Sequence, residues 1–265
     1  MLFRSAGAAK ATFGTGGMLD VYAGTTTPQH LARTTNGTFP IVVFSQGNTL
    51  HWGSEAIMLT AGSNVEWLVN DLGILDDAAS SDEVAASVET SDGVMYVPAL
   101  IGMATPHWDY GARGTLLGLT RGTTRAHVVR AVLEGIAHRG ADLLDATERD
   151  TGLHVERLRV DGGMSRNRVF TQALADVTGR PIDICRDTEA TTLGAGFLAG
   201  VATGVWSSLA ETATLPTPLR AGEPRTPAVS QGDTGAAHSS ASRAQWHEAE
   251  RRARGWIPEL SALNF

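Results

Sequence analysis

The clearest indication of the fold is the sequence LRVDGGMSRN, residues 158–167. It opens with three residues that predict a short strand, and Asp161, Gly162 and Gly163 then turn the chain. A helix over about residues 167–178 follows, and Gly179 ends it. A strand, a glycine turn and a helix in this order indicate an α/β domain. The backbone N–H groups at such a helix start favour an anion or a nucleotide.

Another glycine turn, the first along the chain, lies near the N-terminus in FGTGG, residues 13–17, so the turn at residues 161–163 is the second. The flanking residues predict two short strands, and the turn could present backbone N–H groups and the Thr15 hydroxyl to a phosphate. Taken alone, each turn is more often a plain reversal than a ligand site. Neither turn matches the lysine-bearing phosphate loop or the dinucleotide pattern G-x-G-x-x-G.

The remaining pattern predicts a mixed sheet covered by helices. Residues 39–45 complete a three-strand antiparallel meander, and strands and helices alternate after it. Apolar residues three and four apart predict one helix over residues 55–72. Further strands are expected at residues 94–97, 158–160 and 182–185, and further helices at residues 82–89, 124–149 and 188–205.

The chain divides by composition into three parts. Residues 1–210 carry the α/β pattern, and residues 211–243 are rich in Pro, Ser and Ala and predict a flexible insertion. Residues 244–265 predict a C-terminal helix that packs back on the domain.

Composition excludes several classes of function. With 21 Lys and Arg against 28 Asp and Glu, the net charge of −7 argues against binding nucleic acid. Cys185 is the only cysteine and the eight histidines show no metal-ligand spacing, so we expect no disulfide and no metal cage. No apolar run reaches the roughly 18–20 residues of a membrane span. We expect a reducing, cytoplasmic location.

Several ordered motifs together resemble the C-terminal half of FGGY-family carbohydrate kinases. The similarity spans about residues 9–206 and the terminal helix, and it is strongest toward the family members that phosphorylate glycerol. The motifs that carry it are GTLLGL (114–119) with HVVRAVLE (127–134), YVPAL (96–100), PHWD (106–109), ARG (112–114), AG (61–62) with WL (67–68), 158–167 and 191–200.

The resemblance implies a fold, a cofactor and a set of contacts. The family has the actin-like ATPase architecture, built from ribonuclease H-like domains, so we expect an α/β domain with a mixed five-stranded sheet, the antiparallel meander and flanking helices. It implies ATP with Mg²⁺, bound in a cleft between two domains. The ATP contacts it implies are Thr15, Gly62, Glu66, Gly163 and Asn167, with Gly14, Gly16 and Gly162 beside them, and Met18 on the substrate side.

Two positions depart from the family pattern. Glycerol-phosphorylating members carry Gln where this chain has Glu66, whose carboxylate only accepts hydrogen bonds. They carry Phe where this chain has Met18. Both departures loosen the assignment to glycerol as the substrate.

The catalytic group of the family is a further departure. The resemblance places a catalytic Asp shortly before the first glycine turn, but residues 1–17 hold no carboxylate. No catalytic residue is therefore assigned here. An N-terminal domain, in cis or in trans, would supply that base and most substrate contacts, and this chain alone is expected to transfer phosphate poorly or not at all.

Three functions follow from these observations. The first is ATP-dependent phosphorylation of glycerol to glycerol 3-phosphate, with this chain as the C-terminal half. The second is the same reaction on another sugar or polyol, such as a pentulose or gluconate. The third is a non-catalytic nucleotide-binding or regulatory module. Family members commonly form dimers or tetramers, so a homo-oligomer stays open.

Overall fold

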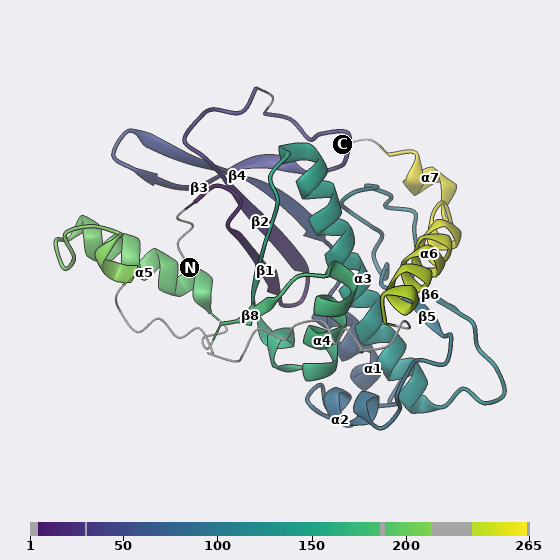
Figure 1. Cartoon of the computed structure of the whole chain (residues 1–265). Helices are drawn as coiled ribbons and strands as arrows, with labels where there is room; N and C mark the ends of the chain where they lie inside the picture. The colour runs from purple at the N-terminus through teal and green to yellow at the C-terminus, as the bar shows by residue number, and fades with distance from the viewer. Residues whose placement is uncertain (1–4, 30, 186–188, 214–234, 264–265) are drawn as a thin grey trace.

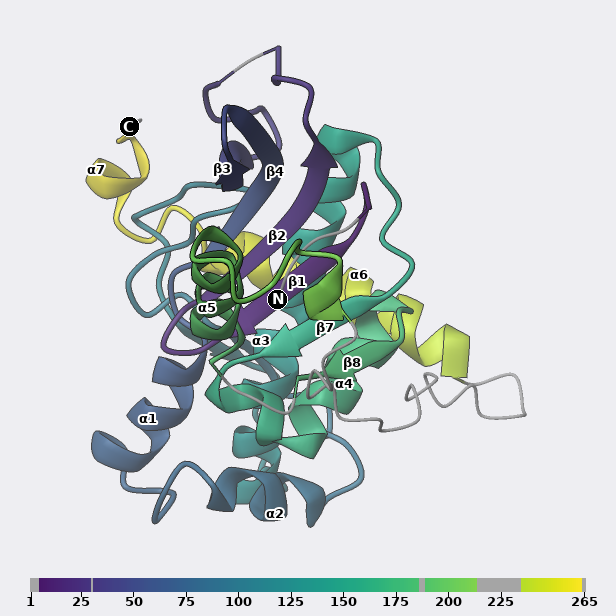
Figure 2. The same ribbon diagram turned by 90° about the vertical axis from the view of Figure 1, so that its left-hand side faces the viewer.

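The computed structural model describes residues 5–29, 31–185, 189–213 and 235–263. A six-stranded mixed sheet lies at its centre, and α3 (Arg125–Thr151) and α5 (Ala190–Ala202) lie on opposite sides of it (Figures 1 and 2). The strands follow the order β3 (Phe39–Gln46), β4 (Thr49–Met58), β2 (Gly17–Gly24), β1 (Ala9–Phe13), β7 (Leu158–Asp161) and β8 (Ile182–Ile184).

Strand pairing confirms the mixed sheet and corrects its details. β1 runs parallel to β7 and β7 to β8, whereas β1–β2, β2–β4 and β3–β4 are antiparallel. The sheet has six strands in the described part of the chain, not five. The expected meander is interrupted as well, because β4 lies between β2 and β3.

The extra strand occupies part of the expected helix over residues 55–72. Residues 55–58 belong to β4, and the helix α1 runs only over Gly62–Asn70. Glu55 lies opposite Asp20 on one side and Phe39 on the other, so the strand bonds to neighbours on both edges. Ala56 and Met58 are buried in the core, which favours the strand over a helix.

The other elements follow the predicted order, except that β6, α7 and the two 3₁₀ helices were not predicted. β5 (Met95–Val97) pairs with β6 (Thr115–Leu117) in a separate two-stranded sheet, so the strand expected at residues 94–97 lies outside the main sheet. The remaining helices are α2 (Ser80–Ala86), α4 (Arg168–Thr178), α6 (Gly235–Ala253), α7 (Pro258–Ser261) and the 3₁₀ helices η1 (Gly163–Arg166) and η2 (Glu211–Ala213).

The main core lies between α3 and one face of the sheet. Because side chains alternate along a strand, every second residue of β1, β2, β4 and β7 points toward α3. Gly140 of α3 lets Phe13 and Leu174 approach, since a Cβ there would lie 2.8 Å from Leu174 and 3.1 Å from Phe13. The core residues of these strands are Ala9, Ala11, Phe13, Leu19, Val21, Ala56, Met58, Leu158 and Val160.

The C-terminal helix α6 packs on α3. Trp246 is fully buried, and its indole N–H donates to Asp142 at 2.9 Å. Arg139 of α3 donates to Glu250 of α6 at 2.9 Å. The helix begins at Gly235, so its first turns fall within the expected insertion over residues 211–243, as does η2. Residues 214–234 of that segment lie outside the described residues.

Within the described ranges, none of the helices combines the length and the apolar character that crossing a bilayer requires. The cytoplasmic location stays a prediction.

Candidate functional site

The first glycine turn joins β1 to β2 and bonds to the start of α1. The N–H of Gly62 donates to Gly14 O at 2.8 Å, and those of Ala61 and Ser63 donate to Thr15 O at 2.8 and 3.2 Å. A Cβ on Gly62 would lie 2.6 Å from Gly14 O, so only glycine allows this approach. The turn leaves Thr15 exposed, and a Cβ on Gly14 would meet nothing within 4 Å. Open backbone therefore faces outward beside the start of α1.

The second glycine turn lies directly against the end of β1. Thr12 of β1 is the register partner of Asp161 of β7, and the two strands are parallel, so both chains leave the sheet at the same edge. Gly162 has a φ of +86°, and a Cβ there would lie 2.4 Å from Phe13 O. The structure thus brings together the two turns, which are far apart in the sequence. We call residues 13–17, residues 161–163 and the start of α1 at Gly62 the junction.

Gly163 and Met164 extend this junction. Gly163 is exposed, and an added Cβ would meet nothing within 4 Å. Met164 lies behind it and approaches α1, because a Cβ on Gly62 would be 3.6 Å from Met164 Cγ. The first turn, the second turn and the start of α1 therefore form one surface with bare backbone at Gly14 and Gly163.

Asn167 caps α4 and bonds to α2. Its Oδ1 accepts from the Phe170 N–H at 2.8 Å, and its Nδ2 donates to Ser81 Oγ at 3.0 Å. The half-buried side chain is thereby held at both polar ends. The sequence predicts only that a helix begins near residue 167, and the structure adds the Asn167 cap and the bond to Ser81.

Asp82 of α2 also bonds to the start of α4, and sequence analysis missed it. Its Oδ1 accepts from the N–H groups of Arg168 and Val169 at 2.8 and 3.0 Å, and its Oδ2 from the Arg168 side chain at 2.8 Å. Burial alone would raise the pKa of Asp82, but these bonds hold it below its usual value. The predicted anion position at this helix start is therefore occupied by a carboxylate of the same chain.

Glu66 and Met18 lie at the margin of the junction. Glu66 is exposed one turn into α1, and no described residue bonds to its carboxylate. Met18, directly after the first turn, is 47% exposed on the sheet face that points away from α3. No hydrogen bond or ion pair in the described part of the chain joins either side chain to Asn167.

The same face carries a group of buried charges close to Met18. Asp20 lies opposite Glu55, and Lys10 reaches Asp161 at 3.3 Å and Thr191 of α5 at 2.7 Å. Burial, with Glu55 beside it, raises the pKa of Asp20 to about 7. Asp161 is 1% exposed, so its carboxylate is buried beside the Lys10 ammonium.

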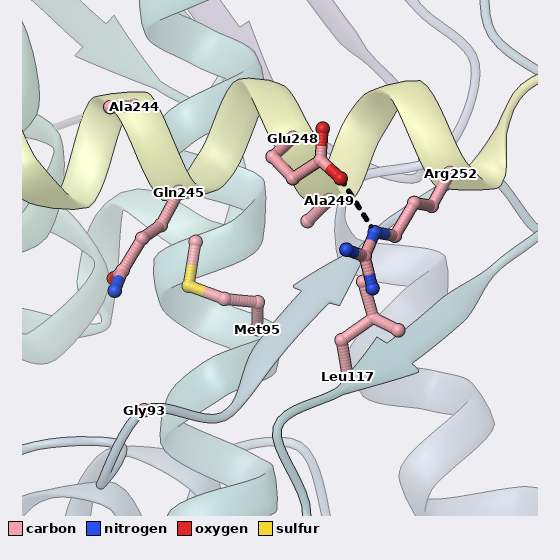
Figure 3. Close-up of a pocket in the computed structure, with 8 residues that line it drawn as sticks. All are labelled: Gly93, Met95, Leu117, Ala244, Gln245, Glu248, Ala249 and Arg252. Carbon is pink, nitrogen blue, oxygen red and sulfur yellow. Dashed lines mark hydrogen bonds and ion pairs between the residues drawn. The ribbon is translucent and has the colours of Figure 1, made fainter.

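A hollow of about 400 Å³ lies elsewhere, between α6 and the β5–β6 sheet (Figure 3). Met95, Leu117 and Ala249 make it apolar, and none of the glycine-turn residues lines it. At its rim Arg252 bonds to Glu248 at 2.8 Å, which leaves that carboxylate satisfied within the chain. The hollow is therefore distinct from the junction of the two turns.

Among the described residues, no three His, Cys, Asp or Glu side chains stand close enough to hold a metal ion.

The fold and the junction define a class of protein. A mixed sheet with helices on both sides, and glycine turns where neighbouring parallel strands end, is the ribonuclease H-like domain of the actin-like ATPase architecture. The chain belongs to the FGGY family of carbohydrate kinases, whose C-terminal domain matches residues 9–203.

Curated proteins and solved structures that resemble this chain are carbohydrate kinases as well. The glycerol kinase of Koribacter versatilis is 40% identical over 252 residues, which are 95% of this chain and 48% of that protein. Plasmodium falciparum glycerol kinase, solved with ADP, superposes with a TM-score of 0.80 at 30% identity over 94% of this chain and 47% of that one. A xylulose kinase from Brucella ovis superposes with a TM-score of 0.72 at 25% identity over 98% and 50%. This chain spans about half the length of the relatives it matches.

Proposed function

We propose that this chain is the nucleotide-binding half of an ATP-dependent kinase that phosphorylates glycerol to glycerol 3-phosphate. The observation that supports the proposal most directly is the junction of the two glycine turns, in a chain whose relatives include glycerol kinases. The ADP in the Plasmodium falciparum structure supports a nucleotide as the ligand.

The residues of the junction divide the nucleotide between them in this proposal. Thr15, with Gly14 and Gly16, offers a hydroxyl and open backbone to the phosphates, which would bring Mg²⁺ with them. Gly162, Gly163 and Asn167 form the wall for adenosine. Gly62 keeps the start of α1 against Gly14, and Glu66 lies one turn further along this helix, at the margin of the junction.

The bare backbone at Gly14 and Gly163 fits such a ligand. A side chain at either position would project into open space, so a nucleotide can approach the main chain there. When bound, ATP supplies the phosphoryl group. The chain's own part is to hold the nucleotide and to keep its phosphates in one position for an incoming hydroxyl.

The complete reaction requires a second half in this proposal. The chain covers about half of its relatives, and residues 1–17, where the family resemblance places the catalytic Asp, hold no carboxylate. An N-terminal domain, in cis or in trans, would supply the base, the opposite wall of the cleft and most contacts to glycerol.

Isothermal titration tests nucleotide binding first. ADP with Mg²⁺ is titrated into this chain alone and into the chain mixed with the separately expressed N-terminal half of the Koribacter versatilis relative. We expect binding in both, and glycerol-dependent ADP release from ATP only in the mixture. Absence of nucleotide binding in both samples would overturn the proposal.

Another sugar or polyol is the second candidate substrate, and Met18 favours it. A flexible methionine stands exposed on the open sheet face where glycerol-phosphorylating relatives are expected to carry Phe. A panel of glycerol, xylulose and gluconate with the reconstituted enzyme decides between them. Clear preference for glycerol would exclude this candidate. Nucleotide binding without turnover of any substrate would instead favour a non-catalytic module.

A further inference from the structure

The backbone N–H groups in the first turn of α4 already donate hydrogen bonds to side chains of this chain. A helix start normally leaves several N–H groups without partners, and these attract anions. Here Asp82 accepts from Arg168 and Val169, and Asn167 accepts from Phe170. The Arg168 N–H, which is the α4 donor nearest in sequence to the second glycine turn, is thus bound to the Asp82 carboxylate of α2.

Ser81 fixes the other end of the Asn167 side chain. It is 2% exposed, its Oγ accepts from Asn167 Nδ2 at 3.0 Å, and the same hydroxyl donates to Ala78 O at 2.6 Å. Since Asn167 Oδ1 is bound to the Phe170 N–H, the amide is held in one orientation. Two adjacent residues of α2 therefore determine where α4 begins and how Asn167 lies.

α2 is itself fastened to the long helix α3. The guanidinium of Arg130 donates to Val88 O at 2.8 Å and to Ala85 O at 3.3 Å, at the C-terminal end of α2. Glu134 accepts from the same side chain at 2.7 Å. α2 thus joins α3 at one end and α4 at the other, so Ser81 and Asp82 are held in place relative to the core.

We propose that Asp82 and Ser81 are positioning residues for the nucleotide. This inference rests on the proposed function, since it assigns them the task of holding Gly163 and Asn167 where adenosine binds. They touch no nucleotide themselves. By occupying the α4 amides with a negative charge, Asp82 also keeps a phosphate away from that helix start, so the uncharged part of the nucleotide faces it.

A graded series of variants tests this role by titration with ADP. Asp82→Ala removes both the acceptor and the charge, and should weaken ADP binding about tenfold. Asp82→Asn keeps a neutral acceptor for the two N–H groups and should weaken binding about threefold. Ser81→Ala frees the Asn167 amide and should weaken binding about threefold. Asp82→Glu should recover part of the loss, and Glu83→Gln, an exposed neighbour on α2, should leave binding unchanged.

Two further readouts separate positioning from plain destabilisation. Amide hydrogen exchange at Arg168 and Val169 should accelerate in Asp82→Ala, while exchange in the sheet stays slow. Binding is measured where denaturant curves show every variant to be folded. If folded Asp82→Ala and Ser81→Ala bind ADP as tightly as the parent chain, the positioning role is wrong. If the parent chain itself binds no ADP, the proposed function fails instead.

Discussion

Two glycines of the junction have opposite surroundings, and this predicts opposite effects of adding a methyl group. Gly62→Ala would place a Cβ 2.6 Å from Gly14 O, a backbone atom that cannot yield cheaply. We expect it to lower the free energy of unfolding by about 1–3 kcal/mol and to weaken ADP binding. Urea denaturation and calorimetric titration measure the two effects.

Gly163→Ala is the matched variant. Its Cβ would meet nothing within 4 Å, so the free energy of unfolding should change by less than about 0.5 kcal/mol. The methyl group would nevertheless stand where we propose adenosine, and ADP binding should weaken. Unchanged ADP affinity in Gly163→Ala would place the nucleotide elsewhere.

Asp20 predicts an unusual pH dependence. Its pKa is raised to about 7 by burial and by Glu55, so the folded chain holds a proton that the unfolded chain releases near pH 4. Stability from this group is complete below about pH 4 and is lost as the pH rises through 7. Asp20→Asn, which mimics the protonated form, should match the parent chain near pH 4 and exceed its stability by about 2–4 kcal/mol at pH 8.

Denaturant curves at several pH values check this expectation. The exposed Asp76→Asn serves as the control, because it removes one carboxylate without touching the buried group. A constant difference between Asp20→Asn and the parent chain from pH 4 to 8 would contradict the raised pKa.

Among single residues, the sequence predicts those whose role depends on neighbouring positions, but not those whose partners lie far away in the chain. The glycines at 14 and 163 indicate turns because they lack a side chain, and Gly179 indicates the end of a helix. Asp82 gives no such signal, because its partners at Arg168 and Val169 lie 86 and 87 positions away. An aspartate in the first turn of a short helix looks like a solvated charge until the fold brings α4 beside it.

Among the elements, β4 shows why periodicity misled. Ile57, Ala61, Val65 and Leu68 recur at intervals of three and four, and this spacing predicts one amphipathic helix. The alternation of buried Ser54, Ala56 and Met58 is present in the same stretch, but it overlaps the helical pattern. Only the pairing with β2 and β3 decides between them, and that pairing depends on residues far from the window.

The helix α6 gives a prediction about anchoring. Trp246 is fully buried, stacks on His138 with ring centroids 5.1 Å apart, and bonds to Asp142. Trp246→Ala should lower the free energy of unfolding by about 3–5 kcal/mol, because it leaves a cavity and removes one hydrogen bond from the buried Asp142 carboxylate. Thermal and urea denaturation measure the loss.

Trp256 is the natural control for this variant. It is 72% exposed, so Trp256→Ala should change stability by less than about 0.5 kcal/mol. Equal losses in the two variants would show that α6 is not anchored through the buried indole.

At the scale of the whole molecule, ligand binding should raise the unfolding temperature. A ligand that binds only the folded chain at a hundred times its Kd stabilises by about 2.7 kcal/mol, which corresponds to roughly 5–10 °C for a domain of this size. Scanning calorimetry with Mg²⁺ and ADP should show that shift in the parent chain and a smaller one in Gly163→Ala. The same shift in both variants would mean that ADP binds away from the second turn.

The overall architecture was the part most open to prediction. The strand–turn–helix order around residues 158–178 and the long helix ending near residue 150 carry the class of fold, because each is a strong local pattern. The order of strands in the sheet was not predictable in the same way. The strand order depends on β4 lying between β2 and β3, and no short segment of sequence predicts that placement.

The parallel pairing of β1 with β7 has a consequence for the newborn chain. β1 is synthesised before the other strands of this sheet. Its neighbour β7, which begins at Leu158, emerges from the ribosome much later. At a synthesis rate of roughly 5–20 residues per second, the edge of β1 that pairs with β7 stays unpaired for several seconds or longer. Ribosome-stalled chains ending before β7 should therefore be cut readily by protease near Phe13, and chains that have also released α4 should resist.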